Sequence, residues 1–327
     1  MAPQLIFGTA TFGMAAAFNN PEDVKSLLTA LKSLNINHLD TAARYPPTNP
    51  WKSEELIGEA EELSRSFVVD TKCYTDTATN GSGDLEKDKM EESVGKSLGL
   101  LHRKSVHVLY AHRADPSTPL EVQIRNFNEQ ITKGRCEAWG VSNFTPSAMK
   151  KLLQICDEKG LEKPKYYQGA YNAITRAVEA KLLPLLRIHG IAFTGYVPLA
   201  GGFLTGNLVN NNTAGTRFDE RGPMGKILKT RFDNAVLASA MMKFDTAVKE
   251  KGLLPAEVSL RWLVHHSALT DQDGIILGAS RVEQVMGNVN LIEKGNLDED
   301  VVALVEQLWK NAEGAHCELI WGNSMEG

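Results

Sequence analysis

The 327-residue chain is poor in cysteine, has no excess of basic residues and contains no long apolar run. Its four cysteines, Cys73, Cys136, Cys156 and Cys317, form no CxxC pair, which argues against a zinc cluster or disulfide framework and favours a reduced, cytoplasmic setting. The formal net charge of -5 gives no bias toward nucleic acid or anionic membranes. Without an apolar stretch of about 18 residues or a secretory signal in MAPQLIFGTATFG, neither a membrane span nor export is expected. A small-molecule enzyme or a protein-binding module is favoured.

Two common nucleotide-binding motifs are also missing. No GxGxxG follows the first predicted strand, and GKS at 95–97 lacks the upstream glycine of a phosphate-binding loop. Short apolar runs instead alternate with segments of helical period. They predict eight strands, at 5–9, 38–41, 67–72, 106–112, 136–142, 166–171, 191–198 and 274–280. Because a helix follows each strand and no linker is evident, residues 1–327 are predicted to form one (β/α)8 TIM barrel, with a doubly wound open sheet as the alternative.

Two segments exceed what a barrel needs. Residues 199–234, after the seventh strand, are rich in glycine, asparagine and arginine and too long for an ordinary connection. An amphipathic helix at 298–312 and a tail follow the last βα unit. Both segments are candidates to cover the barrel mouth. The other predicted helices span 21–35, 53–63 (opened by Ser53), 85–101, 120–134, 145–160, 178–190 and 282–292.

Three polar residues, Asp40, Lys72 and His112, end successive predicted strands. In a parallel barrel the active site lies at the C-terminal ends of the strands, and neighbouring strands are ~4.8 Å apart, so these side chains can converge. Tyr45 follows Asp40 by five residues, on a loop that can fold back over them. Singly, each residue is more often a cap, a surface charge or a core residue. Their joint placement favours a catalytic site.

Together these four side chains can donate a proton to a carbonyl oxygen. A free tyrosine has a pKa of ~10, and the Lys72 ammonium is expected to lower the pKa of Tyr45 by favouring the phenolate. Asp40 would pair with the lysine, and His112 would donate a hydrogen bond to the substrate oxygen. Since no side chain is redox-active, the electrons must come from a cofactor.

Asp70 is the residue most able to disturb the proposed interaction of Lys72 with Asp40 and Tyr45. It has the same strand parity as Lys72, so it either lies inside the barrel as a second carboxylate partner of the lysine or faces a helix and is paired there. In the first case it would raise the pKa of Lys72 and weaken its effect on Tyr45.

Several motifs resemble those of the aldo-keto reductases, NADPH-dependent barrel enzymes that reduce aldehydes and ketones. These are LDTAARY, the lysine of DTK, the histidine of LYAH, GVSNF, YQGAYNAITR, GYVPLAGGFLTG and GASRVEQVMGN. They cover nearly the whole chain, and residues 167–180 and 198–206 are most similar to the aflatoxin-aldehyde reductase type. The resemblance implies that Tyr45 is the general acid, with Asp40, Lys72 and His112 in the roles given above.

The resemblance also implies how NADPH is held. The positions that match nicotinamide contacts are Ser142, Asn143, Gln168 and Tyr196. For Asn143 a helix cap, and for Tyr196 the core, remain alternatives. The positions that match adenosine-phosphate contacts, at a helix N-terminus that favours phosphate, are Ser280, Arg281, Gln284 and Asn288. The candidates for the pyrophosphate in the long loop are Leu199, Gly201, Arg217 and Arg231, and spacing does not choose between the arginines.

Substrate contacts are less constrained by the sequence. Apolar side chains near the mouth favour a hydrophobic or aromatic carbonyl compound; they are Phe12, Met14, Trp51 and Trp321. Arg44 and Arg113 suit an anionic or polyhydroxylated compound instead. No metal site is expected at the strand ends. A second hypothesis is a slow-turnover regulatory or interaction protein that keeps the NADPH site, and a homo-oligomer stays open.

Overall fold

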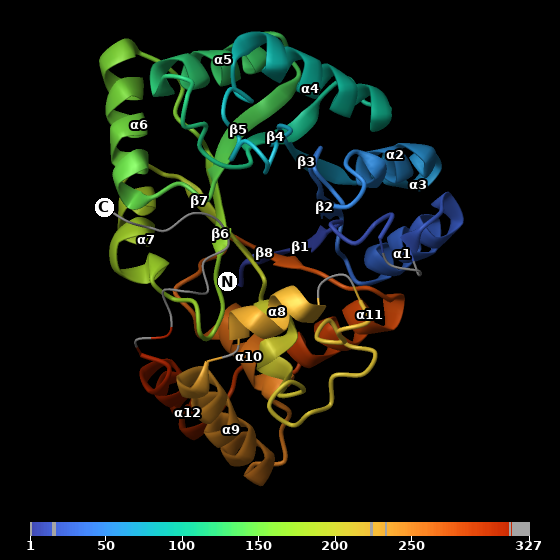
Figure 1. The fold of residues 1–327 in the computed structure, drawn as a ribbon, viewed down its shortest axis with the longest axis vertical. Helices are drawn as coiled ribbons and strands as arrows, with labels where there is room; N and C mark the ends of the chain where they lie inside the picture. Colours follow the sequence, from blue (N-terminus) through green and yellow to red (C-terminus); the bar gives the residue numbers. More distant parts are fainter. Residues whose placement is uncertain (1, 15–17, 223–224, 233, 314, 316–327) are drawn as a thin grey trace.

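The computed structural model describes the chain except residues 1, 15–17, 223–224, 233, 314 and 316–327. Eight parallel strands form a closed barrel in chain order, and β8 pairs back to β1 (Figure 1). The strands are β1 (Gln4–Gly8), β2 (His38–Asp40), β3 (Val68–Lys72), β4 (Val106–Ala111), β5 (Cys136–Ser142), β6 (Tyr166–Ala170), β7 (Ala192–Tyr196) and β8 (Gly274–Leu277). The predicted barrel is confirmed, and the open sheet is wrong.

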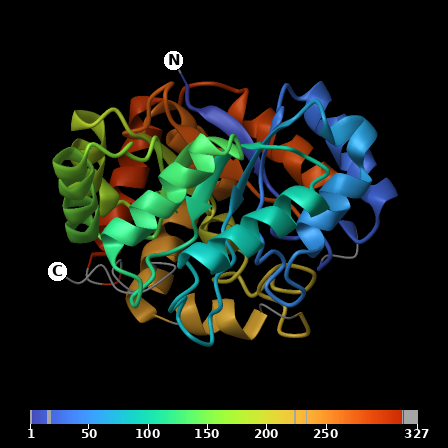
Figure 2. The same ribbon diagram turned by 90° about the horizontal axis from the view of Figure 1, so that it is seen from above.

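Helices surround the barrel in both views (Figure 1, Figure 2). They are α1 (Pro21–Ser33), α2 (Lys52–Glu59), α3 (Glu61–Ser64), α4 (Lys87–Leu100), α5 (Leu120–Thr132), α6 (Pro146–Lys159), α7 (Val178–Ile188), the 3-10 helix η2 (Ala200–Thr205), α8 (Gly225–Phe232), α9 (Ala235–Glu250), α10 (Pro255–His265), α11 (Val282–Ile292) and α12 (Glu299–Asn311). Asn20 and Thr145 cap α1 and α6, and a proline follows each. Among the described residues, no helix has both the length and the apolar character needed to cross a membrane.

The helix predicted at 53–63 is wrong in its start and its continuity. α2 begins at Lys52, after Trp51 in the left-handed region (φ 77°), and α3 begins after a break at Ala60. Ser53 is therefore no cap. Its buried hydroxyl lies 2.7 Å from that of Thr9 and 3.0 Å from that of Thr41, so it ties α2 to the barrel.

The long segment after β7 packs its aromatic side chains into the core of the protein. The rings of Phe203 and Phe232 stack with centroids 4.5 Å apart, and Phe218 lies edge-on to Phe232. Gly201 and Gly202 have φ values of 67° and 104°, which glycine adopts without strain. The segment is therefore folded, with η2 and α8 inside it. The sequence prediction did not resolve α9 and α10, which follow before β8.

The added C-terminal helix lies beside the barrel. α12 packs against α9 and α10 at one edge of the molecule (Figure 1). Arg176, which precedes α7, binds Glu306 of α12 at 2.8 Å. The prediction that this helix covers the mouth is wrong, because its apolar stripe, Val301, Val305 and Leu308, is buried there. The tail, including Trp321, lies outside the described residues.

A buried carboxylic acid links α2 to its neighbours. Glu54 is fully buried, and its two oxygens accept hydrogen bonds from Thr71 Oγ1 at 2.5 Å and Ser97 Oγ at 3.0 Å. Burial raises its pKa from 4.5 to about 7, because two hydroxyl donors do not replace the lost water around the charge.

The Glu54→Gln variant is expected to be more stable than the wild type at alkaline pH. Since the pKa of Glu54 is about 7 when folded and 4.5 otherwise, the folded state holds the extra proton, and wild-type stability falls as pH rises through this window. The variant does not lose stability in this way, and the wild-type loss is at most roughly 3.5 kcal/mol at ~1.4 kcal/mol per pKa unit. Urea unfolding at about pH 5 and about pH 8 measures it. A stability difference that is the same at both pH values would contradict the prediction.

Candidate active site

Asp40, Lys72 and His112 lie together at the C-terminal ends of three neighbouring strands. β2 ends at Asp40, β3 ends at Lys72, and His112 is one residue beyond β4. Asp40 and Lys72 are 3% and 1% exposed, and the loop after β2 brings Tyr45 against the ammonium of Lys72. The structure therefore brings together the four residues that the sequence placed at the site.

Lys72 and Asp40 form a buried ion pair. Lys72 Nζ donates to both carboxylate oxygens at 2.7 Å and to the Thr41 carbonyl oxygen at 2.9 Å. Burial works to lower the pKa of Lys72, but Asp40 and Tyr45 outweigh it and raise that pKa, so the ammonium keeps its proton. Burial raises the pKa of Asp40, against Lys72 and a 2.8 Å hydrogen bond from Gln168 Nε2. The Lys72 ammonium contacts both oxygens of Asp40, so Asp40 is a carboxylate and the pair is ionic.

Tyr45 lies between the lysine and the histidine. Lys72 Nζ is 5.0 Å from the centroid of its ring, and the His112 ring is edge-on to it, with centroids 5.7 Å apart and planes at 87°. Burial raises the pKa of the phenol by more than Lys72 lowers it. The expected net lowering of this pKa is therefore wrong. The phenol is fully protonated at neutral pH and gives up its proton only to a stronger base, such as an oxygen that is becoming an alkoxide.

His112 is a neutral imidazole. Burial lowers its pKa well below 6.5, and the positive charges of Lys72, Arg113 and Arg44 lower it further. Its buried Nδ1 has no hydrogen-bond partner in the part of the chain that the structure describes. A neutral imidazole beside Tyr45 can donate one hydrogen bond to a bound oxygen without competing for the proton of the phenol.

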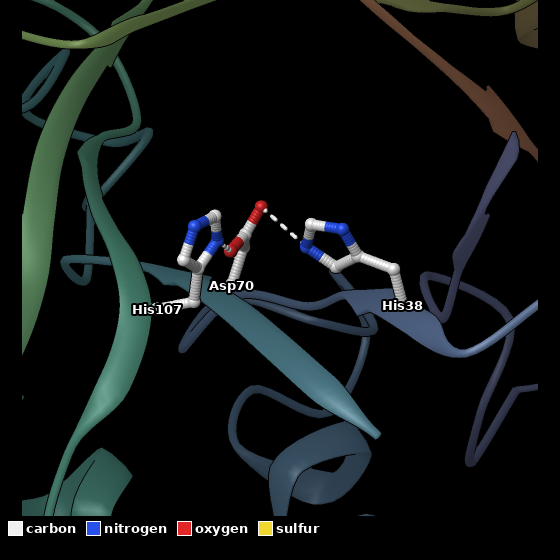
Figure 3. A group of neighbouring side chains, drawn as sticks. All are labelled: His38, Asp70 and His107. Carbon is white, nitrogen blue, oxygen red and sulfur yellow. Dashed lines mark hydrogen bonds and ion pairs between the residues drawn. The ribbon is translucent and has the colours of Figure 1, made fainter. Parts of the chain in front are cut away.

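Asp70 does not compete with Asp40 for Lys72. Its Oδ1 accepts hydrogen bonds from His107 Nδ1 at 2.8 Å and from the Val108 N–H at 3.1 Å, and its Oδ2 lies 2.9 Å from His38 Nε2 (Figure 3). Burial works to raise its pKa, but the two histidines lower it on balance, so it is a carboxylate. A direct pair with Lys72 and a pair against a helix are both wrong predictions, although the charge of Asp70 does help to raise the pKa of Lys72. One signal was available in the sequence, since His38 shares strand parity with Asp40.

Of the four residues at the predicted nicotinamide positions, Ser142 ends β5, Asn143 follows it and Tyr196 ends β7, whereas Gln168 is the third residue of β6. The Asn143 amide donates to the His112 carbonyl oxygen and to Ser142 Oγ, and its Oδ1 accepts from the Tyr196 hydroxyl at 2.7 Å. Asn143 is no helix cap, because Thr145 caps α6, and Tyr196 is only half-buried. Gln168 Nε2 is held by Asp40, so the amide has a fixed direction.

The predicted adenosine-phosphate positions lie at the start of α11. Gln284 Oε1 accepts from the Ser280 N–H at 2.8 Å and from its hydroxyl at 3.0 Å. Arg281 is exposed, and its side chain has no ion-pair or hydrogen-bond partner among the described residues. Asn288 is half-buried two turns further along the helix. Arg281 is thus the side chain at this helix start that is free to bind an anion.

Both loop arginines remain candidates for the pyrophosphate. Arg217 is exposed, and desolvation by the protein around it lowers its pKa. Arg231, in α8, is close enough to the Tyr196 phenol to interact with it electrostatically. Leu199 directly precedes η2, and Gly201 is buried within it.

The predicted apolar substrate contacts mostly pack elsewhere. Phe12 is fully buried, with ring centroids 6.2 Å from Phe7 and 5.5 Å from Phe18, so a substrate cannot reach it without rearrangement. Its assignment as a substrate contact is not retained. Trp51 stacks on Tyr74 at 5.5 Å and under the Lys96 ammonium. Met14 is half-buried in the turn after β1.

The two predicted arginines bind the loop that follows β3. Arg44 Nη2 donates to Thr77 Oγ1 at 2.6 Å, and Arg113 Nη1 donates to Asn80 Oδ1 at 2.8 Å. Neither pairs with a carboxylate in the described residues, and both lower the pKa of His112. They therefore leave uncompensated positive charge beside His112.

Asp115 organises the same loop and was missed in the sequence. Its carboxylate accepts hydrogen bonds from the N–H groups of Gly83 and Leu85 and from Thr118 Oγ1 at 2.7 Å. These donors lower its pKa to about 2. The available signal was the run DPST, since an aspartate before serine and threonine readily accepts from the backbone N–H groups that follow it.

A buried lysine–carboxylate pair, a protonated phenol and a neutral imidazole at the C-terminal ends of a closed parallel barrel define an enzyme of the TIM-barrel class that transfers protons to a bound molecule. Comparison with known proteins makes this specific. The chain belongs to the aldo/keto reductase family, whose model matches residues 4–310. The predicted resemblance and the prediction of an oxidoreductase are confirmed.

Individual relatives agree with this assignment. "Aflatoxin B1 aldehyde reductase member 2" of Mus musculus is 33% identical, and the match covers 94% of this chain and 85% of the relative. "Oxidoreductase sirO" of Leptosphaeria maculans is 32% identical over 94% of each chain. The structure of an aldo-keto reductase from Klebsiella pneumoniae in complex with NADPH has the same fold, with a TM-score of 0.69 and 21% identity, and the match covers 94% of this chain and 91% of that one.

Proposed function

We propose that this protein reduces an aldehyde or ketone to an alcohol with NADPH. The observation that carries the proposal is the placement of the protonated Tyr45 phenol beside the Lys72–Asp40 ion pair and the neutral His112. NADPH, when bound, supplies a hydride to the carbonyl carbon. Tyr45 gives its proton to the carbonyl oxygen, Lys72 stabilises the resulting phenolate, and His112 orients the oxygen by a hydrogen bond.

The residues of this chain fit NADPH. The Arg281 side chain is exposed and has no partner in the described residues, and Arg281 stands at the N-terminus of α11. A free guanidinium at a helix N-terminus suits the binding of a phosphate group. Gln168, Asn143 and Ser142 would hold the carboxamide, and the half-buried ring of Tyr196 would lie against the nicotinamide. The arginines of the long loop would bind the pyrophosphate. The NADPH complex of the Klebsiella pneumoniae protein supports the same choice of cofactor.

The substrate is a small carbonyl compound, and the names of several relatives support an aldehyde. Arg44 and Arg113, near His112, support a polar or anionic group on it. With Phe12 in the core and Trp51 against Tyr74, the structure lends less support to an aromatic substrate than the sequence did. Buried thiols at Cys73, Cys136 and Cys156 support a reduced, cytoplasmic setting.

The test is the loss of NADPH absorbance with a panel of aldehydes and ketones, with and without a carboxylate. Turnover that requires Tyr45 supports the reductase. If the wild type and Tyr45→Phe were equally inactive while both bound NADPH tightly, the reductase proposal would fail, and the slow-turnover interaction protein would replace it.

The Arg281→Ala variant is expected to bind NADPH about tenfold or more weakly and NADH almost unchanged. A hydrogen bond to a charged group contributes ~1.5–3 kcal/mol, and NADH lacks the phosphate that the guanidinium would bind. Fluorescence titration with both cofactors measures this. Arg125→Ala is the matched control, since Arg125 is exposed on α5 and pairs with Glu121. Equal losses for NADPH and NADH would assign Arg281 another role.

A further inference from the structure

We propose that the end of the barrel opposite Tyr45 binds a divalent transition-metal ion, zinc by preference, through His38, Asp70 and His107 (Figure 3). The sequence predicted no metal site at the C-terminal ends of the strands. This site is elsewhere, because His38 begins β2 and His107 is the second residue of β4. None of its three side chains takes part in the proposed reduction, although Asp70 lies in register with Asp40 on the neighbouring strand.

The three side chains converge from neighbouring strands. One ligand atom of each, two imidazole nitrogens and a carboxylate oxygen, lies within 4.8 Å of the other two. The nitrogens lie 2.8 and 2.9 Å from the carboxylate oxygens that they face. A tetrahedral zinc site with bonds of ~2.0–2.2 Å separates its ligand atoms by roughly 3.4 Å. Small rotations of the side chains therefore suffice to admit the ion.

One ligand atom lacks a proper partner. The His38 side chain is 5% exposed, and its Nε2 points at Asp70 Oδ2 but forms no hydrogen bond of acceptable geometry with any described residue. Leaving a buried polar atom without a hydrogen bond is unfavourable. A metal ion bound between this nitrogen and the carboxylate would satisfy both.

The surroundings are those of a metal site. The other nitrogen of His107, Nε2, lies 3.4 Å from the Tyr166 hydroxyl, and the Val108 N–H donates to Asp70. Partners of this kind orient the ligands of protein-bound metals. The His107 side chain is 26% exposed, which gives an ion a way in and leaves room for water as a fourth ligand. Two imidazole nitrogens and one carboxylate suit a divalent ion of zinc type better than magnesium or calcium, which prefer oxygen ligands.

The experiment is a calorimetric titration of the tag-free full chain, stripped with chelator and dialysed, with zinc sulfate. We expect saturation at one zinc ion per chain. His107→Gln should weaken binding by about tenfold or more, and His102→Gln, which changes an exposed histidine next to Glu61, should leave it unchanged. Zinc should also raise the Tm of the wild type but not that of His107→Gln.

Absence of equimolar binding by the wild type would overturn the proposal, and would leave the cluster as a hydrogen-bonded support of the barrel. Unchanged binding by His107→Gln would also overturn it, by placing the ion elsewhere. If that variant did not fold, a crystal of the zinc-loaded wild type decides. An anomalous zinc peak among the three side chains supports the site, and a peak only at other residues rejects it.

Discussion

Replacing Tyr45 by phenylalanine is expected to lower kcat for carbonyl reduction by about 10²–10⁴-fold, the usual contribution of a general acid, and to leave NADPH binding within about twofold. The change removes one hydroxyl and keeps the ring that lies between Lys72 and His112. Hydride transfer without a proton donor leaves an alkoxide in a buried site, which only the His112 hydrogen bond stabilises. Steady-state rates and a fluorescence titration with NADPH measure the two effects.

Tyr74→Phe is the matched control for this change. Tyr74 follows β3, but its ring stacks on Trp51 at 5.5 Å. We therefore expect its variant to keep wild-type turnover within about threefold, as for a residue that gives no proton to the substrate. Equal losses in the two variants would mean that packing near the mouth, and not the Tyr45 proton, limits the rate.

The sequence was sufficient to predict that Asp40, Lys72 and His112 lie together, because in a parallel barrel the order of the strands along the chain determines which strand ends are neighbours. Asp40 and Lys72 end adjacent strands, so their convergence required only the strand count and the side-chain parity. Tyr45 required one further assumption, that the loop after β2 folds inward. The motifs then identified the family.

What the sequence could not supply depends on contacts between elements. The partners of Asp70 come from two other strands, and nothing in VVDTK indicates that His107 lies on one side and His38 on the other. Phe12 was predicted to lie at the mouth because it follows β1 closely, but its ring packs against those of Phe7 and Phe18 in the core. The net pKa of Tyr45 depends on how far burial exceeds the effect of Lys72, which is a property of the packed site.

The Lys72→Met variant is expected to lose about 3–5 kcal/mol of unfolding free energy together with nearly all activity. Lys72 is 1% exposed, and its ammonium is 2.7 Å from both oxygens of Asp40, so its removal leaves a buried carboxylate with only the Gln168 amide as a side-chain partner. Breaking a buried pair from one side has a cost of this size because the remaining charge is uncompensated. Urea unfolding measures the stability, and NADPH oxidation measures the activity.

The double variant Lys72→Met with Asp40→Asn separates these two effects. Replacing Asp40 by asparagine removes the unpaired buried charge that destabilises Lys72→Met. The double variant should therefore be more stable than Lys72→Met by about 2 kcal/mol or more. If the two substitutions acted independently, their losses of unfolding free energy would add and the double variant would be less stable. Activity should stay as low as in Lys72→Met, because Tyr45 still lacks the ammonium that would stabilise its phenolate. A double variant less stable than Lys72→Met would show that Asp40 supports the barrel through Gln168 and the backbone. In that case the charge of Lys72 would not be what determines the contribution of Asp40 to the stability of the protein.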